Sequence, residues 1–263
     1  MFKVSVPELI VKLPSAGLLD YSPAEVRLRA ITGKEEMKMN STNLIKYIDL
    51  VIKECAKDAT TGQPLEMDKL SSEDKVYLFI MLRSLSYGDS MVAGYTCNSC
   101  GTNNDVSLEL SKLPIKNLTK EMLSNSTITL PVSKIILELR IISDHEVYEL
   151  DAEARTMEIK TKKAFKECKD LLLKVRRIKS VTFEDDEKGL ITEENSASNR
   201  SIFQLLVENL IGKDLAYIDK KWNELNDYGI NLTVDHKCSN CGVVSPIGVD
   251  VTSTEFFRPS DSE

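Results

Sequence analysis

The sequence contains no apolar run that approaches the roughly 20 residues required by a membrane-spanning helix. Charged residues and a proline interrupt the apolar positions of residues 1–13, so this segment does not have the clean apolar stretch of a secretory signal. We therefore expect a soluble protein that is made in a cytosol and has no membrane partner. In that compartment, cysteine pairs are more often metal sites or redox motifs than structural disulfides.

An excess of basic residues is also absent. The 263 residues include 34 lysines and arginines against 41 aspartates and glutamates, which gives a formal net charge of −7. Proteins that bind DNA or RNA usually present a basic face, because contacts with phosphates dominate their affinity. The densest basic run, from Lys160 to Lys179, is interpreted as the solvated face of a long helix. Nucleic acid is therefore not an expected partner.

The usual motifs of catalytic sites are missing as well. The sequence has two histidines and 11 glycines, with no Gly-x-x-x-x-Gly-Lys-Ser/Thr loop and no Gly-x-Gly-x-x-Gly or Gly-x-Ser-x-Gly motif. His145 is followed by Glu146, but Glu149 stands where a zinc protease has its second histidine. We predict no catalytic residue, no small-molecule substrate and no enzymatic activity.

Six cysteines are present, and four of them form two similar motifs. Residues 97–101 read Cys-Asn-Ser-Cys-Gly, and residues 238–242 read Cys-Ser-Asn-Cys-Gly. A Cys-x-x-Cys turn directs two sulfurs at one point, and the glycine lets the backbone turn back so that amides face the sulfurs. Zinc prefers four ligands in a tetrahedron, and thiolates suit it well. We predict that one structural Zn²⁺ is bound by four residues: Cys97, Cys100, Cys238 and Cys241.

The spacing of these two zinc knuckles leaves alternatives open. Ordinary zinc ribbons separate their cysteine pairs by roughly 15–20 residues, whereas 137 residues intervene between Cys100 and Cys238. A split ribbon is the favoured interpretation; two half-sites completed by another subunit, or reduced thiols without metal, are the alternatives. A redox site is disfavoured because the pairs precede strand-like residues rather than helices. His236 can substitute as a ligand but is interpreted as a surface residue, and Cys55 and Cys168 as buried structural cysteines.

Apolar periodicity predicts an α+β fold, in which helices are combined with short antiparallel hairpins and the two zinc knuckles form one split zinc-ribbon site. We divide the chain into an extended N-terminal arm (1–24), a helical part with the first knuckle hairpin (25–143), a long helix with an acidic loop (144–200), and helices with the second knuckle and an aromatic tail (201–263). Residues 25–263 are expected to form one zinc-clamped unit.

Local composition adds three expectations to this division. Prolines favour an irregular arm over residues 1–24. Residues 144–179 contain no proline or glycine and favour a continuous helix, whereas the acidic, polar residues 181–199 favour a mobile loop.

Two segments are candidates for contact with a partner. Phe256 and Phe257 are adjacent, and adjacent residues of a strand point to opposite faces. One phenylalanine can therefore pack inside while the other docks on a neighbour; the alternative is that both lie under a loop. An extended arm such as residues 1–24 can add to the edge of a neighbour's sheet.

Several of these motifs occur in a known order. They are Leu13-Pro14-Ser15-Ala16-Gly17 before a strand, Thr32-Gly33-Lys34-Glu35-Glu36 opening a helix, Leu82 to Gly88 ending a helix shortly before Tyr95 to Gly101, and Cys238 to Gly242 followed by Phe256-Phe257-Arg258-Pro259. In this order and spacing, the chain resembles the contractile-tail phage baseplate proteins of the T4 type, a family of baseplate hub subunits and hub assembly proteins.

The resemblance implies a component that is present in the host cytoplasm during assembly and then in the virion tail baseplate, with other baseplate and tail proteins as partners. It carries over no catalytic residue. The favoured hypothesis is a structural component of the hub region that acts as a zinc-stabilised adaptor between subunits. The alternatives are a hub assembly chaperone that is absent from the finished particle and a zinc-ribbon module that binds nucleic acid, which the acidic balance disfavours.

Overall fold

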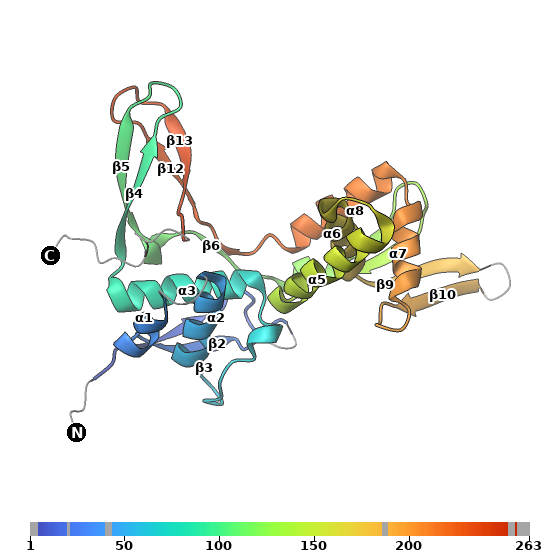
Figure 1. The fold of residues 1–263 in the computed structure, drawn as a ribbon, viewed down its shortest axis with the longest axis horizontal. Coiled ribbons are helices and arrows are strands. Elements are labelled where there is room, and N and C mark those ends of the chain that lie inside the picture. The colour runs from blue at the N-terminus through green and yellow to red at the C-terminus, as the bar shows by residue number, and fades with distance from the viewer. Residues whose placement is uncertain (1–4, 20–21, 40–43, 186–188, 252–255, 257–263) are drawn as a thin grey trace. The chain divides into compact units, whose positions relative to one another are not determined.

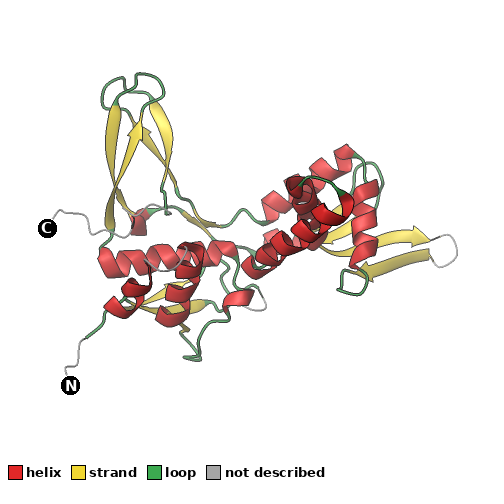
Figure 2. Ribbon diagram, viewed as in Figure 1, coloured by secondary structure: helices red, strands yellow, loops and turns green. Residues whose placement is uncertain are grey.

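The computed structural model describes residues 5–19, 22–39, 44–185, 189–251 and 256 (Figure 1). Over these residues the fold is α+β, with helices and several short antiparallel sheets, as predicted (Figure 2). The chain divides into two compact units. Unit 1 comprises Met1–Met67, Ser72–Asn117 and Tyr228–Glu263, and unit 2 comprises Asp68–Ser71 and Leu118–Asp227. Most of unit 2 is thus an insertion between two parts of unit 1. None of the described helices is long and apolar enough to cross a membrane.

A small antiparallel sheet and the helices packed with it form the body of unit 1. The sheet has the order β1 (Glu8–Lys12), β2 (Glu25–Arg29), β3 (Ala56–Asp58), and the helices are α1 (Gly33–Met39), α2 (Leu44–Cys55) and α3 (Ser72–Tyr87). The short 3₁₀ helix η1 (Met67–Lys69) precedes α3 in the chain, and its residues are divided between the two units. Apolar and charged residues alternate along β2, which places Val26 and Leu28 in the core while Arg27 stays exposed. Helix α2 buries Val51, Ile52 and Cys55 with helical spacing.

The described part of the N-terminal arm is more regular than predicted. Strand β1 pairs with β2, so its residues belong to the sheet of unit 1. The turn after β1 is held on α3 by the fully buried carboxylate of Asp74, which accepts hydrogen bonds from the Ser15 amide (3.0 Å) and the Ser22 hydroxyl (2.9 Å). Pro7 and Pro14 lie on either side of β1, where they leave its hydrogen bonds intact.

Two hairpins complete unit 1. The first consists of β4 (Ser90–Thr96) and β5 (Asn103–Glu109), followed by the 3₁₀ helix η2 (Leu110–Lys112); the second consists of β12 (Thr233–Lys237) and β13 (Val244–Gly248). At the point where the chain leaves unit 1 and returns to it, β6 (Ile115–Lys116) pairs with β11 (Gly229–Ile230). The four hairpin strands stand side by side (Figure 1), as the contacts at their tips require.

The described residue of the aromatic tail packs inside unit 1. Phe256 is fully buried, and its ring stacks on Phe79 of α3 with 5.4 Å between centroids. The Arg83 guanidinium donates a hydrogen bond to the Phe256 carbonyl at 2.9 Å. Phe257, the other residue of the pair, lies outside the described residues, so its docking on a neighbour stays a prediction.

Unit 2 combines a four-stranded antiparallel sheet with helices. The strands lie in the order β10 (Gly189–Glu194), β9 (Ile178–Asp185), β8 (Ile136–Leu139), β7 (Thr127–Thr129). The helices are α4 (Lys120–Ser124), α5 (Asp144–Thr161), α6 (Phe165–Arg177), α7 (Arg200–Asn209) and α8 (Gly212–Leu225). Helices α5 and α6 share an apolar cluster formed by Leu150, Ala154, Cys168 and Leu172.

The structure corrects two local predictions in this unit. Residues 144–179 do not form one helix, because Lys162 adopts a left-handed conformation (φ 58°) and closes α5 by donating its amide to the Glu158 carbonyl at 2.8 Å. Residues 181–199 are not a loop throughout, because β9 and β10 form a hairpin with a bond between the hydroxyls of Thr182 and Thr192 (2.7 Å). The sequence analysis did not recognise these strands because few of their residues, such as Val181, are buried, and most of the exposed ones are polar.

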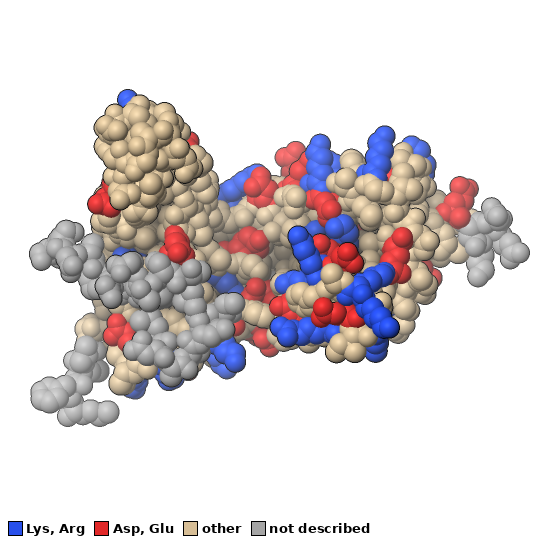
Figure 3. Space-filling model, turned by 45° about the horizontal axis from the view of Figure 1, so that its top comes forward, with Lys and Arg blue, Asp and Glu red and all other residues tan. Residues whose placement is uncertain are grey.

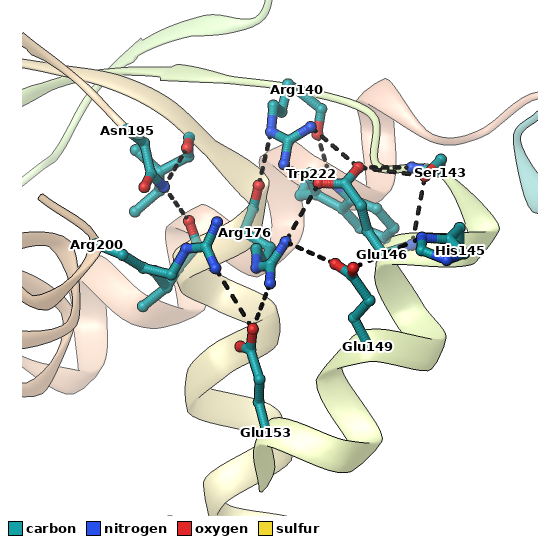
Figure 4. Close-up of polar contacts among 12 residues, drawn as sticks. Arg140, Ser143, His145, Glu146, Glu149, Glu153, Arg176, Asn195, Arg200 and Trp222 are labelled. Atoms are coloured by element: carbon teal, nitrogen blue, oxygen red, sulfur yellow. Dashed lines mark hydrogen bonds and ion pairs between the residues drawn. The ribbon is translucent and has the colours of Figure 1, made fainter. Parts of the chain in front are cut away.

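Acidic and basic side chains alternate over the helices of unit 2 (Figure 3). The buried Arg176 of α6 lies between three carboxylates of α5 and forms an ion pair with Glu153 at 2.7 Å, where Arg200 of α7 also approaches (Figure 4). Ion pairs also join the basic run 160–179 to carboxylates at Lys163–Glu208, Lys169–Asp151, Lys174–Asp219, Arg177–Asp219 and Lys179–Glu138. Much of the positive charge in this run is therefore paired inside unit 2.

Two further buried carboxylates fix local turns. Glu35 accepts hydrogen bonds from the Thr32 amide (2.9 Å) and the Arg29 guanidinium (3.0 Å) at the start of α1. Burial alone raises the pKa of Glu35, but these bonds outweigh it and lower the pKa to about 2. Asp214 accepts from the amides of residues 132 and 133 at 2.9 and 3.0 Å, which lower its pKa below the ordinary value despite burial.

Candidate metal centre

The two zinc knuckles have the same backbone hydrogen-bond pattern. In each, the amide of the first cysteine donates to the carbonyl five residues later, and the amide of the glycine donates back to the carbonyl of that cysteine, all at 2.9–3.0 Å. Gly101 and Gly242 have φ of 73° and 72°. Residues with a side chain rarely adopt this left-handed conformation, which explains why glycine follows each cysteine pair. The hairpins predicted from the sequence therefore place equivalent turns at their tips.

The four predicted ligands come together in the structure. The Sγ atoms of Cys97 and Cys241 lie 3.7 Å apart, as do those of Cys100 and Cys238. All four sulfurs lie within 4.8 Å of one another, and none is in a disulfide. In a regular tetrahedron with Zn–S bonds of about 2.3 Å, the sulfurs are about 3.8 Å apart. The spacing of the thiols therefore fits a tetrahedral metal ion.

The other candidates from the sequence lie elsewhere. Cys55 is buried in the body of unit 1 and Cys168 in the apolar cluster of unit 2. His236 does not belong to the group of four possible ligands; its Nδ1 lies 3.1 Å from the hydroxyl of Tyr95. The two cysteines are therefore buried as predicted, whereas His236 is half-buried against Tyr95 and is not a simple surface residue.

The electrostatic surroundings favour a cation at the centre of the thiols. The hydroxyl and amide of Thr102 lower the pKa of Cys100 to about 6, and the amides of residues 241 and 240 lower the pKa of Cys238. At Cys241 the Val243 amide acts in the same direction, but the neighbouring thiols and burial raise its pKa to about 11. Four sulfurs this close cannot all ionise without a positive charge between them, and a divalent metal supplies that charge.

Asn104 of β5 joins the two hairpins beside the thiols. Its side-chain amide nitrogen lies 3.6 Å from the Cys238 sulfur, and its side-chain oxygen accepts hydrogen bonds from the amide (2.9 Å) and hydroxyl (2.7 Å) of Ser239. Contacts of this kind orient metal ligands. The sequence analysis missed Asn104, although it is the polar member of an alternating buried series with Val106 and Leu108. A polar residue at an inward-facing position of an otherwise apolar strand could therefore have identified Asn104 from the sequence.

An approximate two-fold relation links the two hairpins. Tyr95 and His236 are 141 residues apart and contact each other, with ring centroids 5.7 Å apart in an edge-to-face arrangement. Cys97 and Cys238 have the same separation of 141 residues, and so do Cys100 and Cys241. The first cysteine of each knuckle therefore contacts the second cysteine of the other. Cys97 contacts Cys241 and Cys238 contacts Cys100, with 3.7 Å between the Sγ atoms in both pairs. Such reciprocal contacts are the mark of a two-fold interface.

Comparisons with known proteins address the role of this chain. Searches of curated proteins and of solved structures gave no match. A family model described as "T4 bacteriophage base plate protein" matches residues 6–258, which is nearly the whole chain. This match agrees with the resemblance seen in the sequence and supports a structural role in a phage baseplate. The chain belongs to the T4 bacteriophage base plate protein family.

Proposed function

We propose that the chain is a structural component of the hub region of a contractile-tail baseplate, where a bound zinc ion makes unit 1 a rigid adaptor between neighbouring subunits. The observation that carries this proposal is the meeting of four thiols from two knuckles that lie 138 residues apart, measured from Cys100 to Cys238. Sites with four thiolates in a tetrahedron bind zinc or an iron–sulfur centre. We assign zinc because the distances between the four sulfurs match those around a single zinc ion.

The ligand set supports a structural role for this ion. Four thiolates fill all positions of a tetrahedral zinc ion, so no position remains for water or a substrate. The backbone amides and Asn104 around the sulfurs hold the thiolates without offering a proton donor for catalysis. A centre of this kind contributes folding free energy, and it fixes the two hairpins relative to each other within unit 1.

The surface of the paired hairpins supports an adaptor role. The face of this lobe seen in Figure 3 carries few charged side chains, in contrast to the helices of unit 2. Val92, Val243 and Val244 are exposed on these hairpins, two of them directly beside the second knuckle. Apolar side chains on a rigid, nearly uncharged projection suit contact with another protein. We therefore expect this lobe to face a neighbouring baseplate subunit.

Metal analysis of the purified protein tests the first part of the proposal. Elemental mass spectrometry should find about one zinc per chain, and a variant with Cys97 and Cys238 both replaced by serine should contain none. Zinc-free protein from metal-replete expression, or another metal at equal occupancy, would overturn the zinc assignment.

Particle composition tests the second part. Quantitative mass spectrometry of purified virions should detect the chain at a fixed copy number, and cross-links should connect unit 1 with hub proteins. Absence from the finished particle, combined with presence in assembly intermediates, would instead establish the assembly chaperone. Cross-links confined to the baseplate periphery would overturn the hub location.

A further inference from the structure

One face of the β9–β10 hairpin in unit 2 is exposed and carries an unusual combination of side chains. Leu190 is 73% exposed, and its cross-strand partner is Glu184. Thr182 and Thr192 share this face, as the bond between their hydroxyls shows. Strand β10 is at the edge of the sheet, and no described strand pairs with its outer side. The hairpin thus presents a large apolar side chain next to a carboxylate on an unpaired edge.

A cleft elsewhere in unit 2 has the complementary character. It has a volume of about 500 Å³ and lies between helices α5, α6 and α7. Ala152, Met157 and Leu172 form its apolar part, and Lys160 and Gln204 line it from α5 and α7. Glu153 also lines it, but this carboxylate is paired with Arg176 and Arg200. Its volume is at the lower end of the range for small-ligand sites and is sufficient for a leucine side chain and its neighbours.

The positive charge beside this cleft is not neutralised within the described part of the chain. Lys163 is bound to Glu208 at 3.2 Å, but Lys160, Lys162 and Lys166 have no ion pair or side-chain hydrogen bond with any described residue. This contrasts with the following turns of α6, where lysine and arginine side chains are paired with carboxylates. A carboxylate that enters the cleft would therefore meet the unpaired ammonium group of Lys160.

We propose that the β9–β10 hairpin of one copy docks into the α5–α6–α7 cleft of a second copy. Leu190 covers the apolar floor of the cleft, and Glu184 pairs with Lys160. Because hairpin and cleft are different surfaces, every copy can offer one and accept the other, and such head-to-tail contacts build rings or open chains. The inference requires neither the metal centre nor a place in the hub.

Sedimentation of the full-length protein over a concentration series tests this proposal. Wild-type protein should show concentration-dependent association that weakens as salt is raised, because part of the contact is ionic. Leu190→Asp should abolish association, and Leu190→Ser should weaken it. Met37→Asp is the matched control, since Met37 is 75% exposed and lies on α1 of unit 1; it should associate like the wild type. Monomeric wild-type protein at all concentrations, or unchanged association of Leu190→Asp, overturns the proposal.

A charge exchange separates a specific contact from loss of folding. Glu184→Lys or Lys160→Glu alone should each weaken association by about tenfold or more, because each places like charges opposite one another. The double variant reverses both charges and should recover most of the lost affinity. If the double variant associates no better than the single variants, Glu184 and Lys160 do not meet and the proposed docking geometry is wrong.

Discussion

Removal of the metal should destabilise unit 1 by an amount that follows from the length of chain closed by the centre. Cys100 and Cys238 are 138 residues apart. If unit 2 unfolds together with unit 1, cross-linking a loop of this length contributes about 5 kcal/mol in the chain-entropy treatment of cross-links. If unit 2 stays folded, the flexible part is about 30 residues, and the contribution is about 4 kcal/mol. Cys238→Ser or a chelator should therefore lower the unfolding free energy of unit 1 by about 4–5 kcal/mol.

The position of the single tryptophan allows the two units to be followed separately. Trp222 lies in unit 2, where its indole nitrogen donates to the Arg140 carbonyl at 3.0 Å and the Arg177 guanidinium lies 3.7 Å from its ring centre. Its fluorescence should report unfolding of unit 2, while circular dichroism reports both units. For unit 1, with about 150 residues, we expect Cys238→Ser to lower the melting temperature on the order of 10–20 °C. If the two units unfold separately, the transition seen by Trp222 should stay in place.

Ser99→Ala is the matched control for this experiment. Ser99 lies in the first knuckle, is exposed and is not a thiol ligand, so the variant should retain zinc and the wild-type melting temperature. The reasoning is refuted if chelated protein, Cys238→Ser and wild type melt together. If the Trp222 transition falls together with that of unit 1, the two units unfold as one and the value of about 5 kcal/mol applies.

Three other predictions concern buried carboxylates. Asp74→Ala should lower the stability of unit 1 by about 2–3 kcal/mol, measured by denaturant unfolding. The Ser15 amide and the Ser22 hydroxyl donate hydrogen bonds to Asp74, and both would lose their acceptor in a buried site. The folded-state pKa of Glu35, about 2, lies below its ordinary 4.5, so its contribution is complete above pH 4.5 and is lost as the pH falls towards 2. That contribution is about 3 kcal/mol, and Glu35→Gln should remove this part of the pH dependence from the stability curve of unit 1; an unchanged curve would contradict the assignment. Asp214→Ala should destabilise unit 2 by about 1–3 kcal/mol, because two backbone amides lose their acceptor, and Trp222 fluorescence should detect the shift.

Local patterns predicted much of the fold because they reflect burial directly. The strand over residues 25–29 and helix α3 can be recognised from their apolar spacing, and the ends of the knuckle hairpins followed from the Cys-x-x-Cys-Gly turns. The break at Lys162 could not be predicted, because neither proline nor glycine marks it and only the packing of α5 on α6 favours a left-handed residue there. The β9–β10 hairpin was missed because most of its side chains face solvent and are polar.

The candidate site was more predictable than its surroundings. Thiol spacing identified all four cysteines, because the chemistry of a tetrahedral centre restricts the residue types and their separation. Asn104 and the Tyr95–His236 pair escaped notice because their contacts run between two hairpins that the sequence separates widely. Alignment of the two knuckle segments with each other places Tyr95 opposite His236, so comparison of a chain with itself recovers part of this information.

The insertion of unit 2 also determines the order in which the chain can fold during synthesis. The first knuckle leaves the ribosome 138 residues ahead of the second, an interval of about 7–28 s at ordinary elongation rates. During that time Cys97 and Cys100 offer only half of the ligands, whereas most of unit 2 has already emerged and can fold by itself. The ion can be enclosed only after Cys241 has been added. A product truncated within unit 2 lacks Cys238 and Cys241 and cannot complete the centre. If the chain binds metal as proposed, retention of metal should distinguish finished chains from unfinished ones.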